Sequence, residues 1–106
     1  MKPKEIKAAY EFLKVTAFFD QKLPKRIRIV QKPLKKAWAY YTNIPPTIEL
    51  DERINTGTRL LKVLAHEMTH AALAESGAHG KADHGVEFKT LAEIVCERMG
   101  WPQKGL

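Results

Sequence analysis

Cysteine is almost absent from this chain of 106 residues, in which Cys96 is the only one. A single thiol excludes an internal disulfide, and it excludes a zinc ribbon built from cysteines of this chain. Small secreted domains commonly depend on disulfides, so this cysteine content favours a reducing compartment. We therefore expect a cytoplasmic protein, with Cys96 buried as a small apolar residue.

Long hydrophobic runs are also missing. No segment approaches the about 20 consecutive apolar residues of a membrane helix, so we expect no membrane partner. The N-terminal MKPKEIKAAYEFLK is charged throughout and has neither the apolar segment nor the cleavage site of a signal peptide. No repeat and no linker is visible. With 44% hydrophobic and 28% charged residues, the composition predicts one globular domain over residues 1–106.

Positive charge exceeds negative charge, with 18 Lys and Arg against 12 Asp and Glu, a net charge of +6. A basic domain favours acidic partners, and nucleic acid is one of them. Trp38, Tyr40 and Tyr41 follow the basic clusters, where they would either stack on bases or fill one face of a strand. A solvated surface is the alternative interpretation of the same charges. The candidate DNA contacts are Lys25, Arg26, Arg28, Lys32, Lys35 and Lys36.

Hydrophobic periodicity predicts an α+β fold. Apolar residues at helical spacing predict helices, and alternation predicts strands that form an antiparallel or mixed three-stranded sheet. Phe12, Val15 and Phe19 are expected to widen the buried face of the first helix. Thr56 or Thr58 is a candidate N-cap, and Gly77 and Gly100 are candidate helix ends. The predicted elements are helices 3–20, 58–76 and 85–99 and strands 26–31, 36–42 and 47–50.

The strongest predicted helix carries His66-Glu67-Met68-Thr69-His70, an H-E-x-x-H sequence. Residues i and i+4 lie about 6 Å apart on one helix face, so both imidazoles can bind one Zn²⁺. Glu67 is one position further on, where its carboxylate can take a proton from the water that the metal activates. Two histidines packed or solvated by chance would also produce this pattern. Their place on an amphipathic helix favours a metal.

A catalytic zinc site needs a third protein ligand and one open position. His84 is the favoured candidate, because the glycines between it and His70 let the chain turn back. His79 is a second candidate, and a glutamate of the last helix would give a site with two histidines and one glutamate. The extended metzincin pattern fails, because Leu73 and Ser76 stand where it requires Gly and His. The glutamate candidates are Glu87, Glu93 and Glu97.

HEMTHAALAESG followed by DHGVEFKTLAEIV resembles the SprT-like metallopeptidase family, which includes bacterial SprT and the DNA–protein crosslink protease Spartan. The resemblance covers roughly residues 26–100. It implies a zincin-like fold in which His66, His70 and His84 bind zinc and Glu67 is the general base. Bacterial SprT proteins typically continue into a cysteine-based zinc ribbon. The resemblance therefore implies a bare catalytic core, of the kind a phage would encode and express in the host cytoplasm.

We thus expect a zinc-dependent endopeptidase that acts on protein or peptide substrates, DNA-associated proteins among them. Tyr40 and Tyr41 are candidate donors to the oxyanion, and strand 47–50 is expected to be the sheet edge that pairs with an extended substrate. The alternative function is a basic nucleic-acid-binding module with a structural or inactive zinc site. Glu67 beside an open coordination position favours the enzyme, because structural sites usually have four ligands rich in cysteine.

Overall fold

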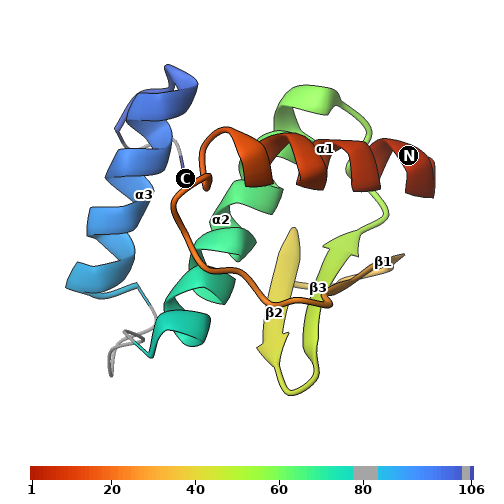
Figure 1. The fold of residues 1–106 in the computed structure, drawn as a ribbon. Coiled ribbons are helices and arrows are strands. Elements are labelled where there is room, and N and C mark those ends of the chain that lie inside the picture. The colour runs from red at the N-terminus through yellow and green to blue at the C-terminus, as the bar shows by residue number, and fades with distance from the viewer. Residues whose placement is uncertain (78–83, 104–105) are drawn as a thin grey trace.

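A computed structural model describes residues 1–77, 84–103 and 106 of the chain. Among these residues, three helices and a three-stranded sheet confirm the predicted α+β class. Helix α2 lies between the sheet on one side and α3 on the other, and α1 packs across α2 (Figure 1). The elements are α1 (Pro3–Val15), β1 (Arg28–Lys32), β2 (Ala39–Asn43), β3 (Pro46–Asp51), α2 (Gly57–Ser76) and α3 (Val86–Met99).

Helix α1 ends earlier than its sequence predicts. It stops at Val15, where Thr16 leaves the helical region and its hydroxyl donates a hydrogen bond to the Phe12 carbonyl oxygen (2.6 Å). The turn that follows buries both Ala17 and Phe18 completely. The prediction that Phe12, Val15 and Phe19 widen the buried face is wrong, because Ile6, Tyr10 and Leu13 fill that face and the other three side chains are exposed.

Strand β3 is the central strand of a mixed sheet with the order β1-β3-β2. It pairs in parallel with β1, where Ile29 lies opposite Ile48, and antiparallel with β2, where Tyr41 lies opposite Ile48. The prediction that strand 47–50 forms a sheet edge is therefore wrong. Ile48 and Leu50 are fully buried, because the inward-facing side chains of the central strand lie in the middle of the core. Strands β1 and β2 are the edges.

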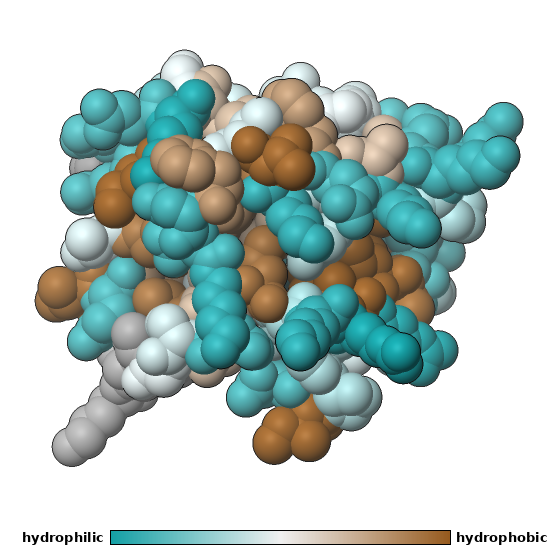
Figure 2. All heavy atoms as spheres, viewed as in Figure 1, coloured by the Kyte–Doolittle hydropathy of each residue, from teal (hydrophilic) through white to brown (hydrophobic). Residues whose placement is uncertain are grey.

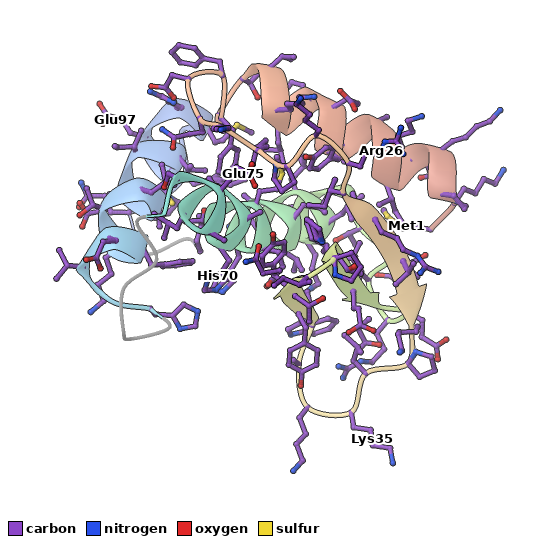
Figure 3. The ribbon with its side chains drawn as sticks, turned by 60° about the horizontal axis from the view of Figure 1, so that its bottom comes forward. Met1, Arg26, Lys35, His70, Glu75 and Glu97 are labelled. Atoms are coloured by element: carbon purple, nitrogen blue, oxygen red, sulfur yellow. The ribbon has the colours of Figure 1, made fainter. Side chains whose placement is uncertain are left out.

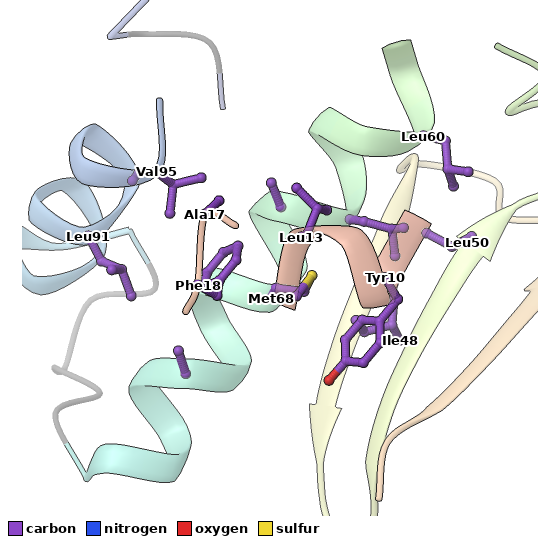
Figure 4. Close-up of a cluster of buried hydrophobic side chains, with 14 of the residues drawn as sticks. Tyr10, Leu13, Ala17, Phe18, Ile48, Leu50, Leu60, Met68, Leu91 and Val95 are labelled. Atoms are coloured by element: carbon purple, nitrogen blue, oxygen red, sulfur yellow. The ribbon is translucent and has the colours of Figure 1, made fainter. Parts of the chain in front are cut away.

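The hydrophobic core fills the space between the helices and one face of the sheet. Leu13 and Phe18 meet Ile48 and Met68 there (Figure 4). On its other side α2 packs against α3, which buries Phe88, Leu91 and Val95. Outside this core, hydrophilic side chains are interspersed with hydrophobic ones on the face that Figure 2 shows. Burial on two sides fixes the position and the rotation of α2.

Both ends of α2 have the predicted signals. The Thr56 hydroxyl caps the N-terminus by accepting a hydrogen bond from the Arg59 backbone N–H (3.3 Å). Gly77 ends the helix with φ of 74°, in the left-handed region that glycine adopts without steric cost. Among the described residues, no helix is long and apolar enough to cross a membrane.

An ion pair joins the last helix to the turn after the first one. Arg98 of α3 donates hydrogen bonds from Nη1 and Nη2 to the two carboxylate oxygens of Asp20, over 2.7 and 2.9 Å. Its Nη1 also donates to the Ala17 carbonyl oxygen (2.9 Å). These hydrogen bonds lower the pKa of Asp20 from 3.8 to about 2. The pair fastens α3 to the turn that ends α1.

Replacing the carboxylate by Asp20→Asn should lower the melting temperature at neutral pH and have little effect near pH 2. The folded pKa lies below the unfolded one, so the stabilisation is complete above about pH 4 and is lost as the pH falls toward about 2. Thermal unfolding between pH 2 and 7 in the presence of a chelator measures it. Glu52→Gln, at an exposed acid on the loop after β3, is the control. A constant difference from wild type across this range would contradict the assignment.

Candidate metal centre and groove

Two helices supply the histidines of the candidate metal centre. His66 and His70 stand one turn apart on α2, and His70 points toward the segment that leads into α3 (Figure 3). His84 precedes α3, whose N-cap is Gly85. Because α2 packs against both the sheet and α3, the contact between the helices determines where the ring of His84 meets the other two rings.

The ring nitrogens of the three histidines converge. The Nε2 atom of His84 lies 3.1 Å from Nε2 of His66 and 3.2 Å from Nε2 of His70. Three nitrogens bound tetrahedrally to one zinc ion at about 2.05 Å would stand about 3.3 Å apart. The observed separations therefore fit one small divalent cation, and the donor set of neutral imidazoles is one that zinc favours.

Phe88 forms a platform under the three imidazoles. Its ring centroid lies 4.9 Å from that of His66, 4.6 Å from that of His70 and 4.7 Å from that of His84. Phe88 is buried, as the sequence predicts for a residue that packs the last helix against α2. Its contact with all three rings was not predicted. The ring excludes water from one side of the cluster and restricts the rotation of each imidazole.

Glu67 lies beside this cluster rather than within it. Its carboxylate is buried, with Oε2 at 4.0 Å from Nε2 of His66. A carboxylate at this distance is close enough to share a water molecule with a metal held by the histidines. The role of Glu67 as a general base stays a prediction.

The glutamates considered as alternative third ligands are not part of the cluster. Among the described residues, the group able to hold a metal consists of His66, His70 and His84. The glutamates of the last helix are exposed and stand outside it, and the alternative ligand His79 lies outside the described residues. The exposed glutamates are Glu87, Glu93 and Glu97.

A groove of about 1100 Å³ passes the metal centre between β2 and α2. One wall is the edge strand β2 and the residues just before it, which include Trp38, and the other is the face of α2 that carries the histidines. Sequence reasoning missed the helix residues of this wall that precede His66. The signal was present, because Arg59, Lys62 and His66 follow one another at helical spacings of three and four. The lining also includes Tyr40, Tyr41, Arg59, Lys62, Val63, Glu67 and Leu106.

The two tyrosines of β2 both line the groove but differ in their surroundings. Tyr40 is exposed, whereas Tyr41 is half-buried and donates a hydrogen bond from its hydroxyl to Oδ1 of Asn43 (3.3 Å). Burial raises the pKa of the Tyr41 phenol, and the negative charge of Glu75 raises it further. Tyr41 therefore keeps its proton at neutral pH and remains a hydrogen-bond donor.

Comparison with known families agrees with this geometry. The model of the SprT-like family matches residues 7–104, which is nearly the whole chain. The chain belongs to the SprT-like family. The resemblance seen in the sequence is thereby confirmed. The family match begins at residue 7, whereas the resemblance was traced only from about residue 26. A comparison with curated proteins gives no significant match.

In this SprT-like chain, His84→Ala should strongly reduce the metal content after loading with zinc, from about one ion per chain for a three-histidine site. Removing one of three ligands leaves His66 and His70, which bind zinc more weakly. Metal analysis after dialysis at neutral pH measures the loss. His79→Ala is the matched control and should retain the ion. Retention in His84→Ala together with loss in His79→Ala would assign the third ligand to His79.

Proposed function

We propose that this SprT-like chain is a zinc-dependent endopeptidase. One observation carries the proposal: the Nε2 atoms of His66, His70 and His84 converge beside the buried carboxylate of Glu67, at the wall of a long groove. A site that only stabilises the fold does not need a carboxylate beside an open coordination position or a groove that gives access to it.

Each residue of the site has its own role in the proposed hydrolysis. His66, His70 and His84 would hold the zinc ion, which when bound supplies a Lewis acid that polarises a carbonyl and acidifies water. Glu67 accepts a proton from the attacking water and delivers it to the leaving amine. Tyr40 and Tyr41 both line the groove and are the candidate donors of a hydrogen bond to the oxyanion; Tyr41 would give up its hydrogen bond to Asn43 in order to donate it.

Strand β2 provides an edge on which an extended substrate can bind. In the part of the chain that the structure describes, the sheet order leaves one side of β2 without a neighbouring strand, and residues of β2 line the groove. A peptide that pairs with this edge would satisfy the strand's backbone groups by β-augmentation and would pass the metal centre. The role first assigned to strand 47–50 therefore moves to β2.

Glu67→Gln should abolish cleavage and leave the metal content unchanged. The amide keeps the shape of the side chain but cannot accept the proton, and loss of a general base commonly lowers the rate by about 10²- to 10⁴-fold. Cleavage of an unfolded protein and zinc content are measured on the same sample. Glu93→Gln, at an exposed acid of α3, is the control. Cleavage at the wild-type rate by Glu67→Gln would contradict the mechanism.

Contact with nucleic acid is a second proposal, supported by exposed cations on the loop between β1 and β2. Lys35 projects from the loop between β1 and β2, whereas Arg26 lies on another side of the molecule (Figure 3). Lys32 forms an ion pair with Glu49 (3.0 Å). The loop lysines Lys35 and Lys36 are therefore the better candidates for contact with phosphates. Such contact would direct the peptidase to DNA-associated proteins, or would be the main function if the zinc site were structural or inactive.

Binding to a single-stranded oligonucleotide should weaken steeply with salt, because each phosphate contact contributes a slope of about −0.7 to log K against log salt. The double variant K35Q/K36Q should make this slope shallower by about 1.4. Fluorescence anisotropy at several salt concentrations measures it, with Lys89→Gln on α3 as the control. An unchanged slope in the double variant would exclude this loop as the contact.

A further inference from the structure

One end of the groove is cationic and contains an aromatic ring. Arg59 of α2 stacks on Trp38 with its guanidinium carbon 4.2 Å from the ring centroid, and Arg53 packs on the same indole at 4.5 Å. Lys62 lies one helical turn further along α2, toward His66. Trp38, Arg59 and Lys62 all line the groove. We call these three residues the cationic end of the groove.

The two arginines beside Trp38 have different partners. Arg53 forms an ion pair with the buried Asp51, and this interaction lowers the pKa of the Asp51 carboxyl. The charge of Arg53 is therefore neutralised within the fold, and its guanidinium holds the indole. Within residues 1–77, 84–103 and 106, the ion pairs involve neither Arg59 nor Lys62. Arg59 stacks on Trp38, and Nζ of Lys62 lies 5.9 Å from the centroid of the Trp101 ring. Contact with an aromatic ring leaves the charge of each side chain uncompensated, so both cations can interact with an anionic group in the groove.

The direction of the strands fixes which part of a bound peptide reaches this end. Strand β2 and helix α2 run in the same general direction (Figure 1). Trp38 lies just before β2 and contacts Arg59 in the first turn of α2, so both elements begin at the cationic end. A peptide that pairs antiparallel to β2, the more stable pairing, runs the opposite way. Its residues C-terminal to the cleaved bond therefore reach the cationic end.

The spacing along α2 gives the position of the contact. Lys62 and Arg59 precede His66 by four and seven residues, which correspond to about 6 and 10.5 Å along the helix axis. An extended peptide advances about 3.3 Å per residue. The two cations thus lie about two to four residues beyond the cleaved bond. Their own offset of about 4.5 Å along the helix lets both side chains reach one carboxylate.

We propose that the cationic end of the groove selects substrates that place a carboxylate about two to four residues C-terminal to the cleaved bond. This specificity rests on the proposed peptidase function. The carboxylate belongs either to an Asp or Glu side chain or to a free C-terminus at that distance. Arg59 and Lys62 bind it through charge-assisted hydrogen bonds, and Trp38 holds the guanidinium of Arg59 in place.

A peptide fits this end of the groove better than a nucleic acid does. The cationic end is continuous with the metal centre, and the side chain between Lys62 and His66 on the groove wall is the apolar Val63. Two adjacent cations match one carboxylate, whereas a nucleic-acid backbone presents a phosphate at every nucleotide and needs a longer basic track. Lys35 projects from the loop between β1 and β2, at a distance from α2 in Figure 3.

The test uses internally quenched peptides of one sequence with Glu, Gln or Lys at the second, third or fourth residue after the cleaved bond. Each peptide has an amidated C-terminus, and a further set ends there with a free carboxylate. We expect kcat/KM for the best Glu peptide to exceed kcat/KM for the matching Gln peptide by about tenfold, and this preference to weaken as salt is added.

The double variant R59Q/K62Q should remove the preference for Glu, and Arg59→Glu should shift the preference toward the Lys peptide. K4Q/K22Q, at two exposed lysines distant in sequence, should preserve it.

Binding separates this inference from the proposed function. In the zinc-loaded Glu67→Gln background, anisotropy should show tighter binding of the Glu peptide than of the Gln peptide, and R59Q/K62Q should abolish the difference. Equal rates and equal affinities for Glu, Gln and Lys peptides would overturn the inference while leaving the peptidase intact. Weaker oligonucleotide binding by R59Q/K62Q without any peptide preference would assign the cationic end to nucleic acid. Cleavage of no peptide by the wild type would reject the proposed function instead.

Discussion

The candidate site depends on the convergence of three imidazoles from two separate helical segments. A helix alone can present His66 and His70 together, because their spacing is one turn, but it cannot supply His84. The third ring reaches the pair only because α3 packs against α2. Phe88 contributes both to the packing of α3 against α2 and to the placement of the rings, since it is buried and its ring contacts all three imidazoles. The packing of α3 against α2 therefore also determines the relative positions of the three candidate metal ligands.

The rest of the fold holds α2 against the strand that faces the groove. One side of the helix enters the core with Leu64 and Met68, and the histidines occupy the side turned toward the groove. Buried Glu67 lies close to the boundary between these sides. A rotation of the helix about its axis would move the imidazoles away from the groove and bury them. The apolar contacts that stabilise the domain thus also orient the histidines of α2 toward the groove.

Much of this arrangement could be predicted from local sequence signals. Some features depend only on residues close together in the sequence and could therefore be predicted from it. They are the H-E-x-x-H spacing, the Thr56 cap and the helix ends at Gly77 and Gly100. The end of α1 could not be predicted this way, because the burial of Ala17 and Phe18 is decided by distant residues. Strand order is also nonlocal. The sequence of residues 47–50 does not indicate that β1 pairs with this strand on the side opposite to β2.

Strand order matters for function because it decides which strand faces the groove. With β3 in the centre, β2 becomes the edge beside α2, and its direction relative to the helix follows from the contact between Trp38 and Arg59. The groove is then electrostatically uneven along its length. Arg59 and Lys62 lie on its wall toward the start of α2, whereas the apolar Ala74 lies on it near the end of the helix. Under the proposed specificity, an extended substrate with a carboxylate on its C-terminal side would match the cationic end in one direction only, so the charges proposed to select the substrate would also orient it across the candidate metal centre.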